Sequence, residues 1–89
     1  MTNSVLIPTL VIGAGAWGSA LAIAMARNGH EVLLWGRNTE HLKAMQQSHS
    51  NERYLPNLPF PASLEVVTDL ERAVQRAKHV LVSVPSDAF

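Results

Sequence analysis

The sequence predicts an α/β fold, a doubly wound parallel sheet with the spatial strand order 3-2-1-4. Two observations lead to this fold class. An apolar run from Val5 to Ile12 leads directly into a glycine-rich turn, Gly13 to Gly18, and a helix pattern follows the turn. Short apolar runs of strand length then alternate with helix patterns along the rest of the chain. Such alternation implies right-handed crossovers between parallel strands.

The first strand is expected over Val5 to Ile12. Pro8 cannot donate a hydrogen bond to a sheet, so the strand proper is expected from Thr9 onward. Residues Trp17 to Asn28 are nearly free of charge and rich in small side chains, which favours a helix packed tightly against the sheet. Asn28 and Gly29 then form a common type of helix end.

The second strand is expected over Glu31 to Trp35, in which Val32 to Trp35 form a continuous apolar run consistent with burial on both faces of a parallel sheet. Trp35 is therefore interpreted as a core residue. Asn38 or Thr39 can cap a second helix that runs to about Gln47. The residues of this helix expected to face inward are Leu42 and Met45.

The rest of the chain supplies a loop, a strand, a helix and a last strand. Three prolines between Ser48 and Ser63 exclude a regular helix over most of that segment, which is read as an ordered loop. Strands are expected over Leu64 to Val67 and Val80 to Val84, with a helix over Asp69 to Ala77 between them. The expected anchors of the loop are Tyr54, Leu55, Leu58 and Phe60, and the expected inner stripe of the helix is Leu70, Ala73, Val74 and Ala77.

The glycine-rich turn has the pattern G-x-G-x-x-G between a strand and a helix, which is typical of Rossmann-type dinucleotide-binding folds. Gly13 allows a sharp turn out of the strand, Gly15 lets bare backbone approach a diphosphate, and Gly18 lets the helix pack close to the sheet. Amide groups at the helix start and the helix dipole both favour an anion there. The alternative is a structural glycine turn in another kind of α/β protein.

Ligands of such sheets bind beyond the carboxyl ends of the strands, where the strand order reverses. We therefore expect Gly13 to Gly18 and Pro85 to Phe89 on opposite sides of one cleft. Trp17 lies where the turn becomes a helix, so its ring either covers the cofactor or fills space between the turn and the sheet.

Arg37 follows the second strand, at a place where NAD-binding proteins usually present a carboxylate to the ribose 2′-hydroxyl. A planar, permanently charged guanidinium suits a 2′-phosphate instead, so NADP(H) is the favoured cofactor and NAD(H) is the alternative. Arg37 can also be a solvated surface residue or stack on the adenine of either cofactor. Glu40 can still approach the ribose.

No residue is assigned a catalytic role. Ser83, Ser86 and Asp87 have no histidine or lysine at an identifiable pairing distance. The histidines lack metal-ligand spacing and fall at expected helix ends or loops, so no metal is predicted and they are interpreted as solvated or capping residues. They are His30, His41, His49 and His79.

The composition argues against several classes of partner. Seven basic and seven acidic side chains are scattered and give a net charge of zero, which offers no electrostatic footprint for nucleic acid or an anionic membrane. The apolar start is too short to span a bilayer and lacks the features of a signal peptide. With no cysteine in the chain, a soluble intracellular protein is expected.

Several motifs together resemble the bacterial NAD(P)-dependent glycerol-3-phosphate dehydrogenases along essentially the whole chain. The more specific ones are the tryptophan-ended second strand, the loop sequence Asn51-x-x-Tyr54-Leu55-Pro56, and the exit Val84-Pro85-Ser86. The resemblance implies reversible reduction of dihydroxyacetone phosphate to sn-glycerol 3-phosphate, for phospholipid synthesis in the cytoplasm. For the intact protein we expect a homodimer.

The resemblance also implies where the family's functional residues fall. Its cofactor contacts map onto the glycine turn, onto Ala16 and Trp17 beside it, and onto Arg37. The family commonly has serine at residue 16, so Ala16 loses a hydroxyl contact but keeps its backbone amide. The catalytic lysines and the substrate-phosphate contacts fall beyond residue 89, in the rest of this domain and in a helical second domain.

Residues 1–89 are therefore expected to be the N-terminal part of a dinucleotide-binding domain, inactive by itself. Two other functions remain open. One is a different two-domain dehydrogenase acting on a hydroxy acid or a nucleotide sugar, and the other is a non-catalytic domain that senses a nucleotide.

Overall fold

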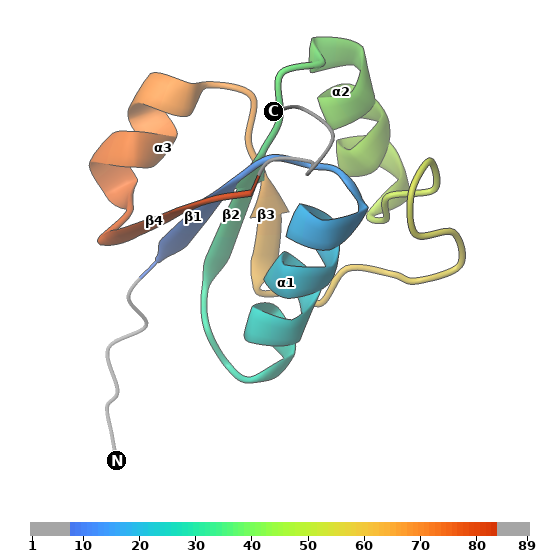
Figure 1. Ribbon diagram of the computed structural model, residues 1–89, viewed down its shortest axis with the longest axis horizontal. Coiled ribbons are helices and arrows are strands. Elements are labelled where there is room, and N and C mark those ends of the chain that lie inside the picture. Colours follow the sequence, from blue (N-terminus) through green and yellow to red (C-terminus); the bar gives the residue numbers. More distant parts are fainter. Residues whose placement is uncertain (1–7, 84–89) are drawn as a thin grey trace.

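The computed structural model describes residues 8–83, and within them four strands and three helices alternate along the chain (Figure 1). All the strands are parallel, and their order in the sheet is β3-β2-β1-β4. The α/β class and the strand order 3-2-1-4 are thus confirmed. The predictions for Val5 to Ile7 and for Val84 to Phe89, including Ser86 and Asp87, lie outside the described residues.

The two inner strands are short and almost completely buried. β1 (Thr9–Ile12) pairs with β2 (Val32–Trp35), with Thr9 opposite Val32 and Ile12 opposite Trp35. Pro8 precedes β1, as its missing N–H requires, and its carbonyl accepts a hydrogen bond from Lys78 N–H at 2.9 Å. Because both strands end level with each other, their carboxyl ends form one edge of the sheet.

Helices cover both faces of the sheet. α1 (Ala16–Arg27) and α2 (Thr39–Ser48) pack on one face, and the shorter α3 (Leu70–Arg76) packs on the other (Figure 1). Alternate residues along the inner strands serve the two cores. The first core includes Val11, Ala22, Ile23, Val32, Leu34, Leu42, Met45, Leu64 and Val66, and the second includes Leu10, Leu33, Val67 and Ala73.

The starts of α2 and α3 follow from their capping residues. The side chain of Asn38 accepts a hydrogen bond from His41 N–H at 3.0 Å, and that of Asp69 accepts one from Arg72 N–H at 3.2 Å. Each acceptor satisfies an amide that has no partner within the helix. Asn38 is therefore the cap of α2, one of the two residues that the sequence offered.

The proline-containing segment 49–63 is an irregular loop with a partly buried inner side. Leu55, Leu58 and Phe60 pack against the first core, as predicted. The prediction of Tyr54 as an anchor is wrong, because 44% of its surface is exposed. Its ring lies edge-on against the ring of His41, with the centroids 5.7 Å apart, so it contacts α2 above the core instead of entering it.

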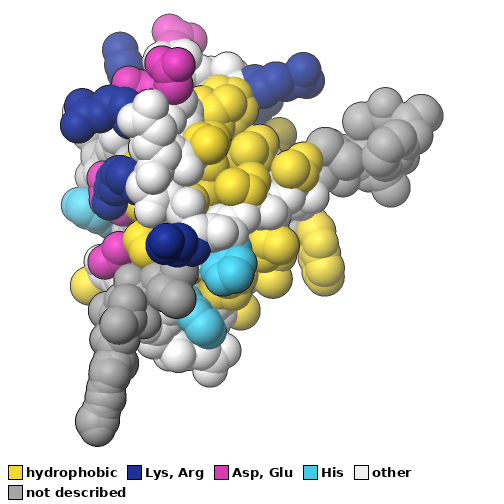
Figure 2. All heavy atoms as spheres, turned by 90° about the vertical axis from the view of Figure 1, so that its left-hand side faces the viewer, with side chains coloured by type: hydrophobic (Ala, Val, Ile, Leu, Met, Phe, Trp, Pro, Cys, Tyr) yellow, Lys and Arg dark blue, Asp and Glu magenta, His cyan; other side chains and the backbone are white. Residues whose placement is uncertain are grey.

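The outer strands are β3 (Leu64–Val66) and β4 (His79–Val82), and every residue of β4 is exposed. Val74 of α3 is 46% exposed, so its prediction as an inner residue is wrong. Two helical turns contact the sheet along a narrow stripe, which Leu70, Ala73 and Ala77 occupy. Figure 2 shows hydrophobic side chains gathered on this side of the molecule, where the exposed apolar residues include Val74, Val80, Leu81 and Val82.

Trp35 ends β2 and lies between the two cores. It packs against residues of both, as predicted for a core residue, but it is only partly buried. The indole Nε1–H donates a hydrogen bond to the carbonyl of Thr68 at 3.3 Å. This contact ties the end of β2 to the segment that follows β3.

Candidate functional site

The glycine turn begins where β1 ends, between the ends of β2 and β4. Gly13 has φ of 121°, and its N–H donates to the carbonyl of Trp35 at 2.7 Å. A Cβ on residue 13 would lie 1.9 Å from the carbonyl oxygen of Ser83, which follows β4. Glycine is thus needed at residue 13 both for its backbone conformation and because the end of β4 occupies the space of a side chain.

Gly18 fixes the packing of α1 against the turn. A Cβ on residue 18 would lie 1.9 Å from the carbonyl oxygen of Gly13 and 3.3 Å from Cβ of Ser83. The sequence predicted close helix–sheet packing here, and the closest neighbour is in fact the turn itself. Gly15 differs, because a Cβ there would meet nothing within 4 Å. The outer side of the turn at Gly15 is therefore open.

The N-terminus of α1 has no side-chain cap. Gly15 is the N-cap residue, no side chain accepts a hydrogen bond from the first turn, and the first turn holds no acidic residue. By contrast, Asn38 and Asp69 cap α2 and α3, and each of those helices has a glutamate in its first turn. The first amides of α1 therefore stay available to an external anion, and the helix dipole favours one.

Trp17 projects from the first turn of α1 with 74% of its surface exposed. The ring therefore does not fill space between the turn and the sheet, which was one of its two predicted roles. Ala16 is also exposed. Both residues lie on the open side of the turn, where a bound ligand can reach their backbone amides.

Arg37 is exposed and immediately follows the buried Gly36 at the end of β2. A Cβ on residue 36 would lie 2.9 Å from Cβ of Ala14, so the end of β2 and the glycine turn are in close contact. The structure therefore brings Arg37 to the same edge of the sheet as Gly13 to Gly18. Glu40, in the first turn of α2, is exposed nearby in sequence.

Asn51 is the residue that the sequence-based interpretation did not place in the site. It is fully buried, and its side-chain amide donates hydrogen bonds to Ala14 and Ser19, one residue on each side of Gly15 to Gly18. The loop sequence Asn51-x-x-Tyr54-Leu55-Pro56 was noted as a family motif. Neither helical nor strand periodicity indicated that its first residue would reach the glycine turn.

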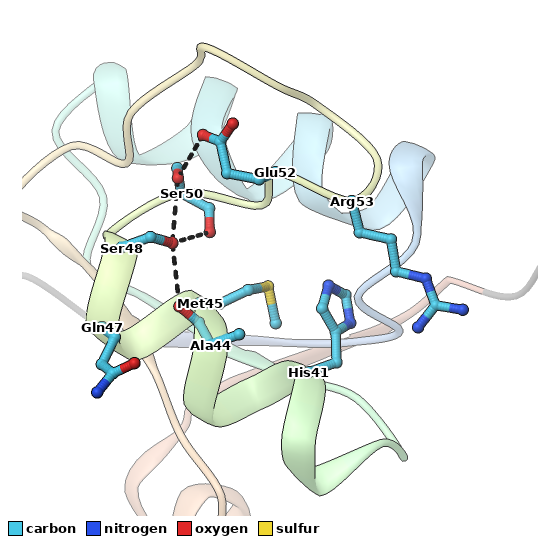
Figure 3. A pocket seen from close by; sticks show the side chains of 8 residues that line it. All are labelled: His41, Ala44, Met45, Gln47, Ser48, Ser50, Glu52 and Arg53. Atoms are coloured by element: carbon cyan, nitrogen blue, oxygen red, sulfur yellow. Dashed lines mark hydrogen bonds between the residues drawn. The ribbon is translucent and has the colours of Figure 1, made fainter.

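A hollow of about 540 Å³ lies between α2 and the segment 50–53 (Figure 3). Three of its polar residues bond to one another: Ser48 Oγ donates to the carbonyl of Ser50 at 3.0 Å, and Ser50 Oγ donates to Glu52 Oε2 at 2.7 Å. The residues that line it are His41, Ala44, Met45, Gln47, Ser48, Ser50, Glu52 and Arg53. No residue of the glycine turn lines it, so it is separate from the predicted cofactor site.

The histidines divide into two groups. His30 is exposed, and His49 ends α2 in the left-handed conformation, as expected for capping or solvated residues. His79 is also exposed, as expected for a solvated residue, although it begins β4 instead of lying in a loop or at a helix end. The interpretation is wrong for His41, which is only partly exposed and whose Nε2 lies 2.9 Å from Oδ1 of Asn51. Within residues 8–83 no three potential ligands among histidine and carboxylate side chains gather to hold a metal ion.

None of the helices within residues 8–83 combines the length and the apolar character that crossing a bilayer requires.

Comparison with known proteins agrees with this geometry. Residues 8–89 match the family model described as NAD-dependent glycerol-3-phosphate dehydrogenase N-terminus. The glycerol-3-phosphate dehydrogenase (NAD(P)+) of Colwellia psychrerythraea is 54% identical over 79 residues, which are 89% of this chain and 24% of the relative. That of Nitrosococcus oceani is 54% identical over 81 residues, covering 91% of this chain and 24% of the relative.

Solved structures agree with the fold. The crystal structure of glycerol-3-phosphate dehydrogenase from Coxiella burnetii superposes with a TM-score of 0.86 at 42% identity, over 90% of this chain and 25% of that one. The Plasmodium falciparum enzyme gives a TM-score of 0.73 at 26% identity, over 89% of this chain and 25% of that one. The chain thus spans about a quarter of the length of the relatives it matches. By sequence and by fold, it belongs to the family of NAD-dependent glycerol-3-phosphate dehydrogenase N-terminal regions.

Proposed function

We propose that residues 13–18 bind the diphosphate of NADP(H) or NAD(H), and that the chain forms the N-terminal part of the dinucleotide-binding domain of a glycerol-3-phosphate dehydrogenase. The observation that carries this proposal is the uncapped start of α1 beside the open side of Gly15. Both lie at the carboxyl edge of a parallel sheet, beside β1, where the strand order reverses between β2 and β4. Free amides and space for bare backbone are what a diphosphate needs.

The other proposed cofactor contacts surround this turn. The backbone amides of Ala16 and Trp17 lie in the first turn of α1, and the exposed indole of Trp17 can lie over the cofactor. Arg37 is exposed at the neighbouring strand end and offers a charged fork to a 2′-phosphate, which supports NADP(H) as the preferred cofactor. The proposed cofactor-binding residues are Gly13, Gly15, Ala16, Trp17, Gly18 and Arg37.

When bound, the nicotinamide supplies the hydride that is transferred. The role proposed for this chain is to hold the diphosphate at the start of α1 and so set the position of the nicotinamide ring. The proposed reaction of the complete protein is the reversible reduction of dihydroxyacetone phosphate to sn-glycerol 3-phosphate. The family resemblance, in which the catalytic lysines and the substrate contacts follow residue 89, supports an inactive role for residues 1–89 by themselves. It also supports a cytoplasmic homodimer.

The test is a turnover assay of the complete protein with dihydroxyacetone phosphate and each reduced cofactor, followed by the loss of nicotinamide absorbance. We expect oxidation of NADPH that depends on dihydroxyacetone phosphate, with a higher kcat/KM for NADPH than for NADH. Hydroxy acids and nucleotide sugars, assayed with NADP+ in the oxidative direction, are the matched comparison. Turnover of one of these, with none of dihydroxyacetone phosphate, would overturn the proposed substrate. Binding of NADPH without any turnover would support a sensing domain.

A further inference from the structure

Asn51 forms a buried bridge across the glycine turn. Its side chain is 0% exposed, and its Nδ2 donates to the carbonyl oxygen of Ala14 at 3.0 Å and to Oγ of Ser19 at 2.7 Å. Ala14 lies within the turn, and Ser19, also 0% exposed, lies in the second turn of α1. One amide group from a distant loop therefore holds both ends of the segment Gly15 to Gly18.

The orientation of this amide follows from its partners. A backbone carbonyl such as that of Ala14 can only accept, so the side of Asn51 that faces it must be the NH2 group. Its Oδ1 then faces the other way, where it accepts a hydrogen bond from Tyr54 N–H at 3.3 Å and lies 2.9 Å from Nε2 of His41. Since Oδ1 cannot donate, His41 must carry a hydrogen on Nε2.

With this orientation every hydrogen-bonding position of the Asn51 side chain has a partner. Both of its hydrogens are donated, and its oxygen accepts two hydrogen bonds. A fully paired polar group in a buried place fixes one geometry, because any other arrangement leaves a donor or acceptor without a partner. The backbone carbonyl of Asn51 also accepts from Leu55 N–H at 2.7 Å, which holds the loop that carries it.

The bridge controls the direction of one peptide group of the turn. In a trans peptide the C=O and the following N–H point in opposite directions. Because the carbonyl of Ala14 is held inward by Asn51, the N–H of Gly15 is directed away from Asn51. Gly15 has no side chain to resist rotation of this peptide, so without the bridge the direction of its N–H is less restricted.

We propose that Asn51 is a positioning residue for the diphosphate site, acting through Ala14 and Ser19 and supported by His41. This inference rests on the proposed function, because it assigns Asn51 to the same dinucleotide site. Asn51 does not touch the cofactor in this proposal. It sets the direction of the backbone amides that contact the cofactor. Its loss should therefore raise the Kd of the cofactor more than it changes kcat at saturating cofactor.

The experiment compares four variants of the complete protein. Asn51→Ala removes the bridge, and Ser19→Ala removes one of its two acceptors while keeping a residue that favours a helix. The matched controls remove similar hydrogen bonds elsewhere. In Ser63→Ala the lost bond is from Ser63 Oγ to the carbonyl of Ala26 at 3.0 Å, at the other end of α1. In Gln46→Ala the lost bond is from Gln46 Nε2 to the carbonyl of Val66 at 2.8 Å.

The measurements are the Kd of NADPH by titration calorimetry, well below each variant's Tm, together with KM and kcat. We expect Asn51→Ala to raise the Kd about tenfold and Ser19→Ala about threefold, with kcat at saturating NADPH within about twofold of wild type. The controls should lower Tm but leave the Kd unchanged. If Asn51→Ala does not fold, the Kd of NADPH in Ser19→Ala is compared with that in Ser63→Ala, and this comparison tests the proposal.

Wild-type affinity in both bridge variants, or an equal loss of affinity in the controls, would overturn the role of Asn51. A different result separates this inference from the proposed function. If the wild-type protein binds neither NADPH nor NADH, the proposed function itself fails, and the inference fails with it. If the wild type binds NADPH and Asn51→Ala binds it equally well, only the inference fails.

Discussion

Gly18 and the carbonyl oxygen of Gly13 approach each other so closely that a Cβ on residue 18 would lie 1.9 Å from that oxygen. The first turn of α1 thus rests directly on the turn that precedes it. Because the N–H of Gly13 is bonded to β2 and its missing side chain faces Ser83, the strand ends and the helix start form one packed unit. This unit fixes where the free amides of α1 point.

Replacing Gly18 by alanine should therefore destabilise the protein. The added methyl group meets backbone atoms that cannot move independently of the strand ends, and overpacking of this kind typically costs about 1–3 kcal/mol. The measurement is urea unfolding of the complete protein followed by circular dichroism. An unfolding free energy equal to that of wild type would show that α1 can shift away from the turn without cost.

Replacing Gly15 by alanine should leave the stability nearly unchanged, unlike the replacement of Gly18, but should weaken cofactor binding. Gly15 has an extended backbone, with φ of −78° and ψ of −170°, and a Cβ there meets nothing within 4 Å. We expect stability within about 0.5 kcal/mol of wild type, since surface substitutions of this kind have small effects. The same methyl group would stand where the diphosphate should approach the backbone, so the Kd of NADPH should rise. Unchanged affinity would place the diphosphate elsewhere.

Trp17 offers a test of the open side of the turn. Because 74% of its surface is exposed, Trp17→Ala should leave Tm nearly unchanged. If the indole lies over the bound cofactor, the same variant should bind NADPH more weakly, because it loses the area that the ring buries there. Calorimetry of unfolding and of NADPH binding on one preparation measures both. A large fall in Tm with intact affinity would contradict this placement.

Most of the fold was predictable because local signals agreed with one another. The apolar runs at residues 9–12 and 32–35 have the length of buried strands, and Asn38 and Asp69 stand where helix caps are needed. The strand order follows from right-handed crossovers, since parallel strands joined through helices have few other arrangements. These signals each depend on residues close in sequence.

The errors concern contacts that depend on the assembled molecule. Tyr54 and Val74 are apolar residues in suitable patterns, but the loop and the short α3 present them to solvent. Asn51 is the reverse case, a polar residue in a loop that becomes fully buried because its partners, Ala14 and Ser19, lie more than 30 residues earlier. No local periodicity encodes such a pairing, so the sequence could place the glycine turn but not the group that holds it.

Removing the capping side chain should lower the free energy of unfolding by about the same amount at α2 and at α3. Asn38→Ala and Asp69→Ala each delete a side-chain acceptor of a first-turn amide, for which losses of about 0.5–2 kcal/mol are typical. Urea unfolding of the two variants measures these losses. Asn38→Ser keeps an oxygen acceptor and serves as the control, with stability expected near that of wild type. Full stability in Asn38→Ala would show that the start of α2 is held by tertiary contacts instead.

The choice between the two cofactors should depend on the charge at residue 37. Arg37 is exposed at the end of β2, so replacing it should change little in the fold. Arg37→Glu exchanges an attractive for a repulsive partner of a 2′-phosphate. It should shift the ratio of kcat/KM values from NADPH towards NADH by about ten- to a hundredfold, or about 1.4–2.8 kcal/mol. The measurement is steady-state kinetics of the complete protein with each cofactor.

Arg27→Glu makes the same charge change at the far end of α1 and is the control, for which the ratio should stay constant. A constant ratio in Arg37→Glu as well would mean that the arginine is solvated or stacks on the adenine, a group that both cofactors share.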